Sequence, residues 1–244
     1  MTEDFSRSLE RLRRARRVVA LTGAGISAES GVPTFRGEGG LWRDYRAEDL
    51  ATPDAFRRDP ELVWEWYDWR RGLIAGCRPN RGHETLALWE GRFESCRVVT
   101  QNVDGLHRAA GSRGVICLHG DIWTVRCTGC GFETVDLTAP LPELPPRCRC
   151  GGLLRPGVVW FGEALPEKAF EAALEAVSRA DVVLVAGTSG LVYPAAGLPA
   201  AARSAGTFLV EINLGRTPLS PLMDAILEGP SGQVLAELHD ALET

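Results

Sequence analysis

The chain has 244 residues, of which 45% are hydrophobic and 24% are charged. These values are typical of a globular protein, so they exclude a collagen-like, low-complexity or disordered chain. The length allows one large domain, or one domain of ordinary size that carries an insertion. The balance of 27 Lys and Arg against 32 Asp and Glu gives a net charge of −5, which argues against direct nucleic-acid binding.

The first 17 residues contain six arginines but lack the apolar run of a secretory signal. Apolar residues recur there at helical spacing, which predicts an amphipathic helix with solvated arginines. A surface that docks to anionic lipid or nucleic acid is the alternative. Seven cysteines, an odd number, indicate a reducing compartment, so we expect a cytoplasmic protein.

Four short apolar runs predict buried parallel strands, at residues 17–21, 97–100, 182–186 and 207–212. Helical patterns lie between them, and the clearest, at residues 166–179, has proline in its first turn. The uncharged stretch 182–202 contains glycines and prolines, so it predicts a strand, a loop and a helix, with no membrane span. Alternating strands and helices predict an α/β fold, a Rossmann-like doubly wound parallel sheet.

Two segments break this alternation and are interpreted as insertions that form a smaller module beside the sheet. Residues 37–77 are rich in Arg and Trp and predict a loop followed by a helix. Residues 127–152 contain prolines, turn residues and four cysteines.

A glycine-rich motif, Gly-Ala-Gly-Ile-Ser-Ala at residues 23–28, directly follows the first predicted strand. Glycines there let the backbone approach a pyrophosphate, and the helix that follows points its N-terminus at the negative charge. A tight turn without a ligand is the alternative. Dehydrogenases place an acidic residue about 20 residues further on. This chain has Thr-Phe-Arg-Gly at residues 34–37 instead, which argues against hydride transfer.

Polar residues follow the second predicted strand, in the sequence Thr-Gln-Asn-Val-Asp of residues 100–104. Ligands bind at the carboxyl ends of strands in open α/β sheets, so these side chains suit a carboxamide or a ribose. Asp104 equally suits the cap of the next helix, and the residues alone leave both interpretations open. A turn of small residues, 187–189, follows the third strand and suits phosphate or ribose contacts.

His119 lies in the sequence Leu-His-Gly-Asp, next to a glycine at a predicted strand end. Imidazole is the usual general base near neutral pH, which makes His119 a catalytic candidate. A single histidine is more often structural, and we keep that interpretation for His83, His107 and His239.

Four of the seven cysteines form two close pairs, Cys127-x-x-Cys130 and Cys148-x-Cys150, with seventeen residues between the pairs. Two pairs of soft thiolates at this separation predict a tetrahedral zinc site, and free buried thiols are the alternative. The second pair is tighter than the usual two-residue spacing. Because cysteine fills all four positions, none is left for an activated water, so the zinc ion is expected to be structural.

Taken together and in this order, the motifs resemble those of the sirtuin family. Pro-Thr-Phe-Arg at residues 33–36 and Val-Val-Trp-Phe-Gly-Glu at residues 158–163 match as well, and the resemblance covers residues 15–240. It implies an NAD-dependent protein-lysine deacylase, which releases free lysine, nicotinamide and O-acyl-ADP-ribose. It also implies a Rossmann-like NAD-binding domain of residues 1–36, 81–122 and 153–244, a helical insertion 37–80 with the acyl pocket, and a zinc-binding insertion 123–152.

The resemblance implies a role for each motif. His119 would be the general base, and Asn102 with Asp104 would hold the nicotinamide carboxamide. Phe35 and Arg36 would close over NAD and shield the reaction from water. The residues implied to contact NAD are Gly23, Ala24, Gly25, Ile26, Phe35, Arg36, Gln101, Asn102, Asp104, Gly187, Thr188, Ser189 and Asn213.

Residues 158–163 resemble the strand with which sirtuins pair an acylated-lysine protein or peptide by β-strand addition. The residues expected at that contact are Val158, Trp160, Phe161 and Gly162.

Tyr67 and Arg70 are three residues apart in a predicted helix and therefore share one face. A phenol and a guanidinium on one face would suit a carboxylate, which Arg binds bidentately. The pair resembles the Tyr-x-x-Arg of sirtuins that remove succinyl and malonyl groups, as does Gly-Gly-Leu-Trp at residues 39–42. Packed aromatic residues with a solvated Arg70 are the alternative. Deacetylation is expected in addition, because a pocket for a longer acid admits acetyl.

Other functions compete with an acidic-acyl deacylase. They are a plain deacetylase, a mono-ADP-ribosyltransferase, a non-catalytic NAD-binding module and, less favoured, a dehydrogenase. The complete set of His119, Asn102 and Asp104 favours a deacylase. We therefore expect NAD as co-substrate, one structural Zn²⁺ ion and acylated-lysine partners, with no membrane association.

Overall fold

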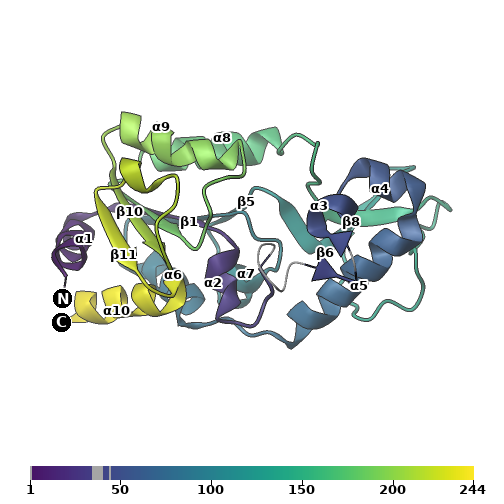
Figure 1. The fold of residues 1–244 in the computed structure, drawn as a ribbon, viewed down its shortest axis with the longest axis horizontal. Coiled ribbons are helices and arrows are strands. Elements are labelled where there is room, and N and C mark those ends of the chain that lie inside the picture. The colour runs from purple at the N-terminus through teal and green to yellow at the C-terminus, as the bar shows by residue number, and fades with distance from the viewer. Residues whose placement is uncertain (1, 35–40, 44) are drawn as a thin grey trace.

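The computed structural model describes residues 2–34, 41–43 and 45–244. A six-stranded parallel sheet forms one half of this part of the chain, in the order β11-β10-β9-β1-β4-β5 (Figure 1). Its strands are β1 (Arg17–Thr22), β4 (Ser95–Thr100), β5 (Val115–Cys117), β9 (Val182–Ala186), β10 (Phe208–Asn213) and β11 (Ala225–Glu228). The chain runs outward from β1 to β5 and then returns to β9 beside β1, so the strand order reverses there. This order confirms the predicted Rossmann-like doubly wound fold.

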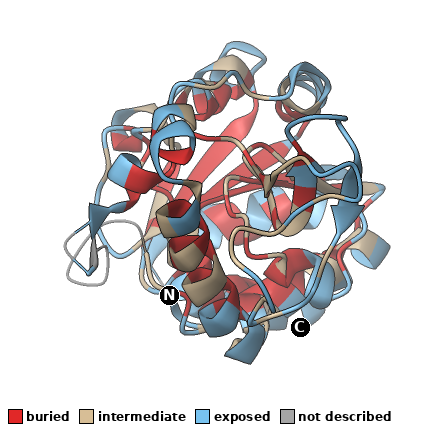
Figure 2. Cartoon of the chain, turned by 90° about the vertical axis from the view of Figure 1, so that its right-hand side faces the viewer, coloured by how far each residue is buried: buried red, intermediate tan, exposed pale blue. Residues whose placement is uncertain are grey.

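Helices cover both faces of the sheet, because successive strand side chains point to opposite sides. Val18 and Ala20 of β1 pack in one core with α1 (Glu3–Arg14), α6 (Arg81–Arg92) and α10 (Ser231–Glu243). Val19 and Leu21 pack in a second core with α8 (Glu167–Ser178) and α9 (Leu198–Ser204). Buried residues accordingly fill the strands between the helical layers (Figure 2).

Most of the predicted elements are present, with shifted ends. The strand expected at residues 97–100 begins at Ser95, and the helix expected at 166–179 spans Glu167–Ser178 with Pro166 as its N-cap. Strands β5 and β11 were not predicted, since three or four residues between turns carry little periodicity. Two short helices follow strand ends, α2 (Ala24–Ala28) and α7 (Leu106–Ala109).

A smaller module lies beside the sheet, at the right of Figure 1. It contains an antiparallel sheet of β6 (Gly120–Cys127), β7 (Glu133–Val135) and β8 (Leu154–Val158). The helices α3 (Ala47–Leu50), α4 (Pro53–Arg58) and α5 (Pro60–Gly76) pack with this sheet in a third core. Strand β6 begins before residue 123 and β8 begins after residue 152, so the small sheet reaches beyond the predicted zinc-binding insertion at both ends. The division of the chain into domains stays a prediction.

The prediction of one helix after a loop at residues 37–77 was wrong. In its described residues, 41–43 and 45–77, the segment contains three helices and a hairpin of β2 (Leu41–Trp42) and β3 (Tyr45–Arg46). Proline stands at the first turn of both α4 and α5, and each helix begins at a side-chain cap, Thr52 and Asp59. These caps satisfy backbone N–H groups, so each helix starts separately.

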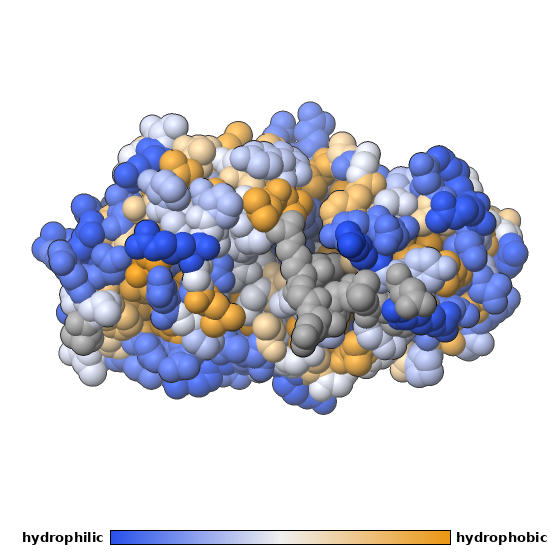
Figure 3. All heavy atoms as spheres, in the orientation of Figure 1, coloured by the Kyte–Doolittle hydropathy of each residue, from blue (hydrophilic) through white to orange (hydrophobic). Residues whose placement is uncertain are grey.

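Among the described residues, none of the helices combines the length and apolar character needed to cross a bilayer. On the face shown in Figure 3, hydrophilic residues are interspersed with smaller apolar patches.

Candidate functional site

The carboxyl ends of β1 and β9 meet in two glycine turns. The Gly25 N–H donates to the Gly187 carbonyl at 2.8 Å, and the Gly23 N–H donates to Ala186 at 3.1 Å. A Cβ on Gly25 would lie 2.6 Å from the Gly187 Cα, and one on Gly187 would lie 2.4 Å from the Ile26 nitrogen. Side chains would therefore force the turns apart. Two bare backbones thus meet where the strand order reverses, which is where nucleotides bind in such sheets.

A buried polar network joins the turn after β1 to the turn after β4. The Asn102 Nδ2 donates to the Gly23 carbonyl at 3.0 Å and to the Ser27 Oγ at 3.1 Å. The Ser27 hydroxyl donates to Asp104 at 2.8 Å, and the other oxygen of that carboxyl accepts from Leu106 N–H at 2.8 Å. Burial raises the pKa of Asp104, against the lowering effect of these two hydrogen bonds. Asp104 therefore caps the start of α7, as one interpretation predicted, and is also part of the network that joins the two turns.

Further polar side chains tie neighbouring strand ends together at this edge. The Gln101 Nε2 donates to the Thr188 hydroxyl at 3.0 Å, and the Asn213 Nδ2 donates to the Thr188 carbonyl at 2.9 Å. Phe35 and Arg36, like residues 39 and 40, lie outside the described residues. The edge brings together the other residues predicted to contact NAD: Gly23, Ala24, Gly25, Ile26, Gln101, Asn102, Asp104, Gly187, Thr188, Ser189 and Asn213.

His119 lies between β5 and β6 with a defined ring orientation. Its Nδ1 is 3.0 Å from the Gln101 carbonyl oxygen. A carbonyl only accepts, so Nδ1 carries the proton and Nε2 keeps its lone pair in the neutral ring. Burial lowers the pKa of His119 below 6.5, against the raising effect of this bond. The backbone is fixed too, because a Cβ on Gly120 would lie 2.1 Å from the Gly157 oxygen and Val159 N–H donates to the His119 carbonyl.

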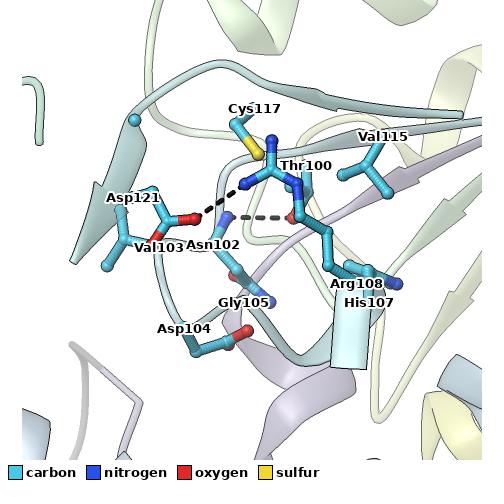
Figure 4. Close-up of a pocket in the computed structure, with 11 residues that line it drawn as sticks. Thr100, Asn102, Val103, Asp104, Gly105, His107, Arg108, Val115, Cys117 and Asp121 are labelled. Carbon is cyan, nitrogen blue, oxygen red and sulfur yellow. Dashed lines mark hydrogen bonds and ion pairs between the residues drawn. The ribbon is translucent and has the colours of Figure 1, made fainter. Parts of the chain in front are cut away.

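A small cavity lies behind Asn102, between α7 and β5 (Figure 4). Thr100 accepts the Asn102 backbone N–H at its hydroxyl, and Arg108 forms an ion pair of 2.7 Å with Asp121 across the opening. The volume is about 10 Å³, which is room for one water molecule. This cavity is too small for a nucleotide. The candidate ligand site is therefore the edge of the sheet formed by the carboxyl ends of β1, β4 and β9, called the strand edge below.

Tyr67 and Arg70 are both buried on α5, with 3% and 8% of their surface exposed. Trp160 donates its indole N–H to the Tyr67 oxygen at 2.9 Å, and the Arg70 guanidinium lies 5.4 Å from the Trp66 ring centroid. Burial lowers the pKa of Arg70, while the nearby Tyr67 and Asp104 raise it. The structure therefore excludes a solvated Arg70 and places this cation within electrostatic range of Asp104.

In residues 158–163, the segment expected to pair with a peptide, only some residues are exposed to solvent. Val158 and Trp160 are buried, whereas Phe161 is 45% exposed and Gly162 is exposed. The Phe161 N–H donates to the Ala51 carbonyl at 2.9 Å, which joins this segment to the end of α3. The surface of this segment therefore offers the Phe161 side chain and the Gly162 backbone, whereas the side chains of Val158 and Trp160 face the interior.

Four cysteine sulfurs gather at one end of the small sheet. All four lie within 4.8 Å of one another, with 3.5 Å between Cys127 and Cys150 and 3.8 Å between Cys130 and Cys148. N–H groups of Cys130 and Gly129 donate to the Cys127 sulfur and lower the pKa of this thiol to about 6. Four soft thiolates at this spacing fit a structural Zn²⁺ ion, and the tight second pair reaches the cluster.

Two buried histidines beside the polar network were predicted to be structural. The rings of His83 and His107 lie 4.8 Å apart, and Thr22 bonds to the His107 Nε2 at 2.9 Å. Burial lowers the pKa of His83 to about 4 and that of His107 to about 3. Neither ring was expected to approach the Ser27 hydroxyl, which lies 3.4 Å from the His83 Nε2.

An ion pair next to the expected peptide strand was missed by sequence reasoning. Arg155 donates to both carboxylate oxygens of Glu163, at 2.6 and 2.8 Å, and its guanidinium carbon lies 3.5 Å from the Trp160 ring centroid. Residues eight apart across an irregular turn follow no helical or strand periodicity, so the sequence contains no signal for this contact.

A family model described as Sir2 family matches residues 23–194. This chain belongs to the Sir2 family. The sirtuin resemblance of the motifs is therefore confirmed.

The chain is 54% identical over 226 residues to an NAD-dependent protein deacylase of Aquifex aeolicus, covering 92% of this chain and 95% of the relative. It is 55% identical over 230 residues to NAD-dependent protein deacylase 2 of Pyrobaculum aerophilum, covering 94% and 92%.

Solved structures agree over almost the whole chain. A Sir2 homologue in complex with NAD superposes with a TM-score of 0.93 at 48% identity, covering 98% of this chain and 93% of that one. A Sir2 complex with a p53 peptide and NAD⁺ gives 0.88 at 33% identity and covers 98% of each chain. The α/β fold with its parallel sheet is thus that of the family.

Proposed function

We propose that this chain is an NAD-dependent protein-lysine deacylase. The observation that carries the proposal is the His119 ring, whose Nδ1 is bound to the Gln101 carbonyl at the end of β4 and whose Nε2 is left basic. The naming of close relatives as NAD-dependent protein deacylases supports it.

The residues present fit NAD at the strand edge. When bound, NAD supplies an anomeric carbon that nicotinamide leaves and ribose hydroxyls that accept the acyl group. The turns at Gly23 and Gly187 would hold the pyrophosphate, and Asn102 with Asp104 would hold the carboxamide. His119 would take a ribose hydroxyl proton at Nε2, which is free at neutral pH because burial lowers the pKa of the ring. Phe35 and Arg36 would exclude water from this step.

We further propose that acidic acyl groups, succinyl and malonyl, are removed in addition to acetyl. Tyr67 and Arg70 share one face of α5, and both are buried. The guanidinium and the phenol are suited to an acyl carboxylate, because an arginine binds a carboxylate in bidentate form and a phenol donates a further hydrogen bond. The alternative is a plain deacetylase, in which Tyr67 and Arg70 only pack against their neighbours on α5 and Trp160.

The test compares matched succinyl-lysine and acetyl-lysine peptides with and without NAD, following nicotinamide and O-acyl-ADP-ribose. Arg70→Met is expected to lower kcat/KM for the succinyl peptide by about tenfold or more, because a charge-assisted pair is lost. Deacetylation should change much less. Arg78→Met, which removes an exposed arginine beyond the end of α5, should change neither rate.

Equal losses on both peptides would refute the carboxylate role of Arg70. Nicotinamide release with ADP-ribose attached to the peptide, and no free lysine, would instead identify a mono-ADP-ribosyltransferase. Mass spectrometry of the products separates these outcomes.

A further inference from the structure

We infer that Trp160 is a positioning residue for acyl-group selection: its indole N–H occupies the Tyr67 oxygen, so that the phenol proton is directed at the acyl carboxylate. This inference rests on the proposed acidic-acyl function and assigns it a residue that acts without touching the acyl group.

The direction of the hydrogen bond follows from the chemistry of the two groups. The indole Nε1 lies 2.9 Å from the Tyr67 oxygen, and an indole nitrogen donates but never accepts. The phenol is therefore the acceptor in this bond, and its own proton remains available for a different acceptor. Burial raises the pKa of Tyr67 far above neutrality, so the proton is present at working pH.

The indole is itself held in one orientation. The Glu163 carboxylate accepts the Trp160 backbone N–H at 2.8 Å and binds Arg155 with both oxygens. The Arg155 guanidinium covers one side of the indole, at 3.5 Å from its centroid, and the Phe56 ring packs at 5.1 Å. Trp160 is only 3% exposed. A ring fixed by a charged pair, a cation–π contact and a second aromatic ring cannot turn away from Tyr67.

This arrangement matters for one class of acyl group. A succinyl or malonyl carboxylate accepts a hydrogen bond from the directed Tyr67 hydroxyl as well as from Arg70. An acetyl group ends in a methyl, which accepts nothing. The indole N–H is therefore expected to affect the rate with acidic acyl groups and to matter little for acetyl.

The test is a double-mutant cycle of Trp160→Phe and Tyr67→Phe, measured as kcat/KM for succinyl and acetyl peptides. Trp160→Phe removes the donor and keeps an aromatic ring, so desuccinylation should fall about tenfold and deacetylation by less than about threefold. In the Tyr67→Phe background, the same substitution should leave the ratio of the two rates unchanged. A purely structural role for Trp160 would lower both rates and would persist in that background.

Trp64→Phe is the matched control. Trp64 lies on the same helix as Tyr67, contacts its ring edge-to-face at 6.4 Å and is fully buried, but its N–H donates to the Leu154 carbonyl. Trp64→Phe should lower the melting temperature without changing the ratio of kcat/KM for the succinyl peptide to kcat/KM for the acetyl peptide. If Trp160→Phe does not fold, a benzothienyl analogue at position 160 replaces the N–H by sulfur at nearly constant shape.

The outcomes separate this inference from the function on which it rests. If Arg70→Met shifts the substrate ratio but removal of the Trp160 N–H does not, the inference fails and the acidic-acyl proposal stands. If the unaltered protein shows no desuccinylation, both fail.

Discussion

At position 119, a backbone oxygen decides which ring nitrogen is basic. The Gln101 carbonyl holds the proton on Nδ1, and Gly120 lets β6 approach β8 closely enough to fix the histidine backbone. A histidine without such a partner would sample both tautomers, so the hydrogen bond determines which nitrogen keeps the lone pair.

We predict that kcat/KM falls only on the acid side of neutrality, with an inflection below pH 6.5. A general base must be unprotonated, and burial lowers the pKa of His119 below its usual 6.5, so the base form predominates at pH 7. The measurement is a pH–rate profile between pH 5 and 8. His239→Gln, at a ring bonded to Trp89, should leave the profile unchanged. An acid inflection at or above pH 6.5 would contradict the assignment.

At the scale of elements, β6 connects the four-cysteine cluster to the candidate site. The strand begins at Gly120, directly after His119, and ends at Cys127. Trp123 in its middle donates its indole N–H to the Asp104 carbonyl at 2.9 Å. Cys127, the end of β6 and one of the four clustered cysteines, is therefore joined by this strand to residues that contact the candidate site.

We predict that Cys150→Ser lowers both zinc content and folding stability. Loss of one ligand weakens a structural site that contributes several kcal/mol, and each kcal/mol moves the Tm by about 2–4 °C at this chain length. Metal analysis and a thermal melt measure the two effects. Cys77→Ser, which alters a cysteine away from the cluster, serves as control. A Cys150→Ser protein with full zinc content and unchanged Tm would show that the cluster has no structural role.

At the scale of the whole molecule, the polar interior makes folding sensitive to acid. His83 on α6 and His107 on α7 are packed against each other and stay neutral, because burial lowers the pKa of the first to about 4 and of the second to about 3. The unfolded chain takes up these protons near pH 6.5. Stability is therefore lost as the pH falls from 6.5 toward 4, whereas the raised pKa of Asp104 acts in the opposite direction.

We predict that the unfolding free energy drops by about 2 kcal/mol for each of these histidines between pH 7 and pH 5. Urea unfolding at the two pH values measures the change. His83→Gln keeps a polar side chain that does not titrate, so it should make stability less dependent on pH. Unchanged stability of the unaltered protein over this range would contradict the assigned burial effect.

Several features follow from residue order because they depend on local geometry. Alternating apolar runs and helical patterns predict the parallel sheet, since strand and helix periods involve residues close in sequence. The glycines after β1 predict a close approach of two backbones, and the cysteine spacing predicts a cluster of four thiols, because both depend on residues close in sequence. The family motifs also predicted which residues contact NAD. Those within the described residues lie at or near the carboxyl ends of β1, β4, β9 and β10.

Other features arise from contacts between distant parts of the chain. Trp160 and Tyr67 are 93 residues apart, and Ser27 and Asp104 are 77 apart. No periodicity connects such pairs, because their approach depends on how helices and sheets pack. Packing of distant segments also buries Arg70. It places the Gln101 carbonyl against the His119 Nδ1, which leaves Nε2 as the basic nitrogen. Residue spacing thus identifies the chemical groups, and their tautomers, proton directions and pKa values depend on neighbours that only folding brings close.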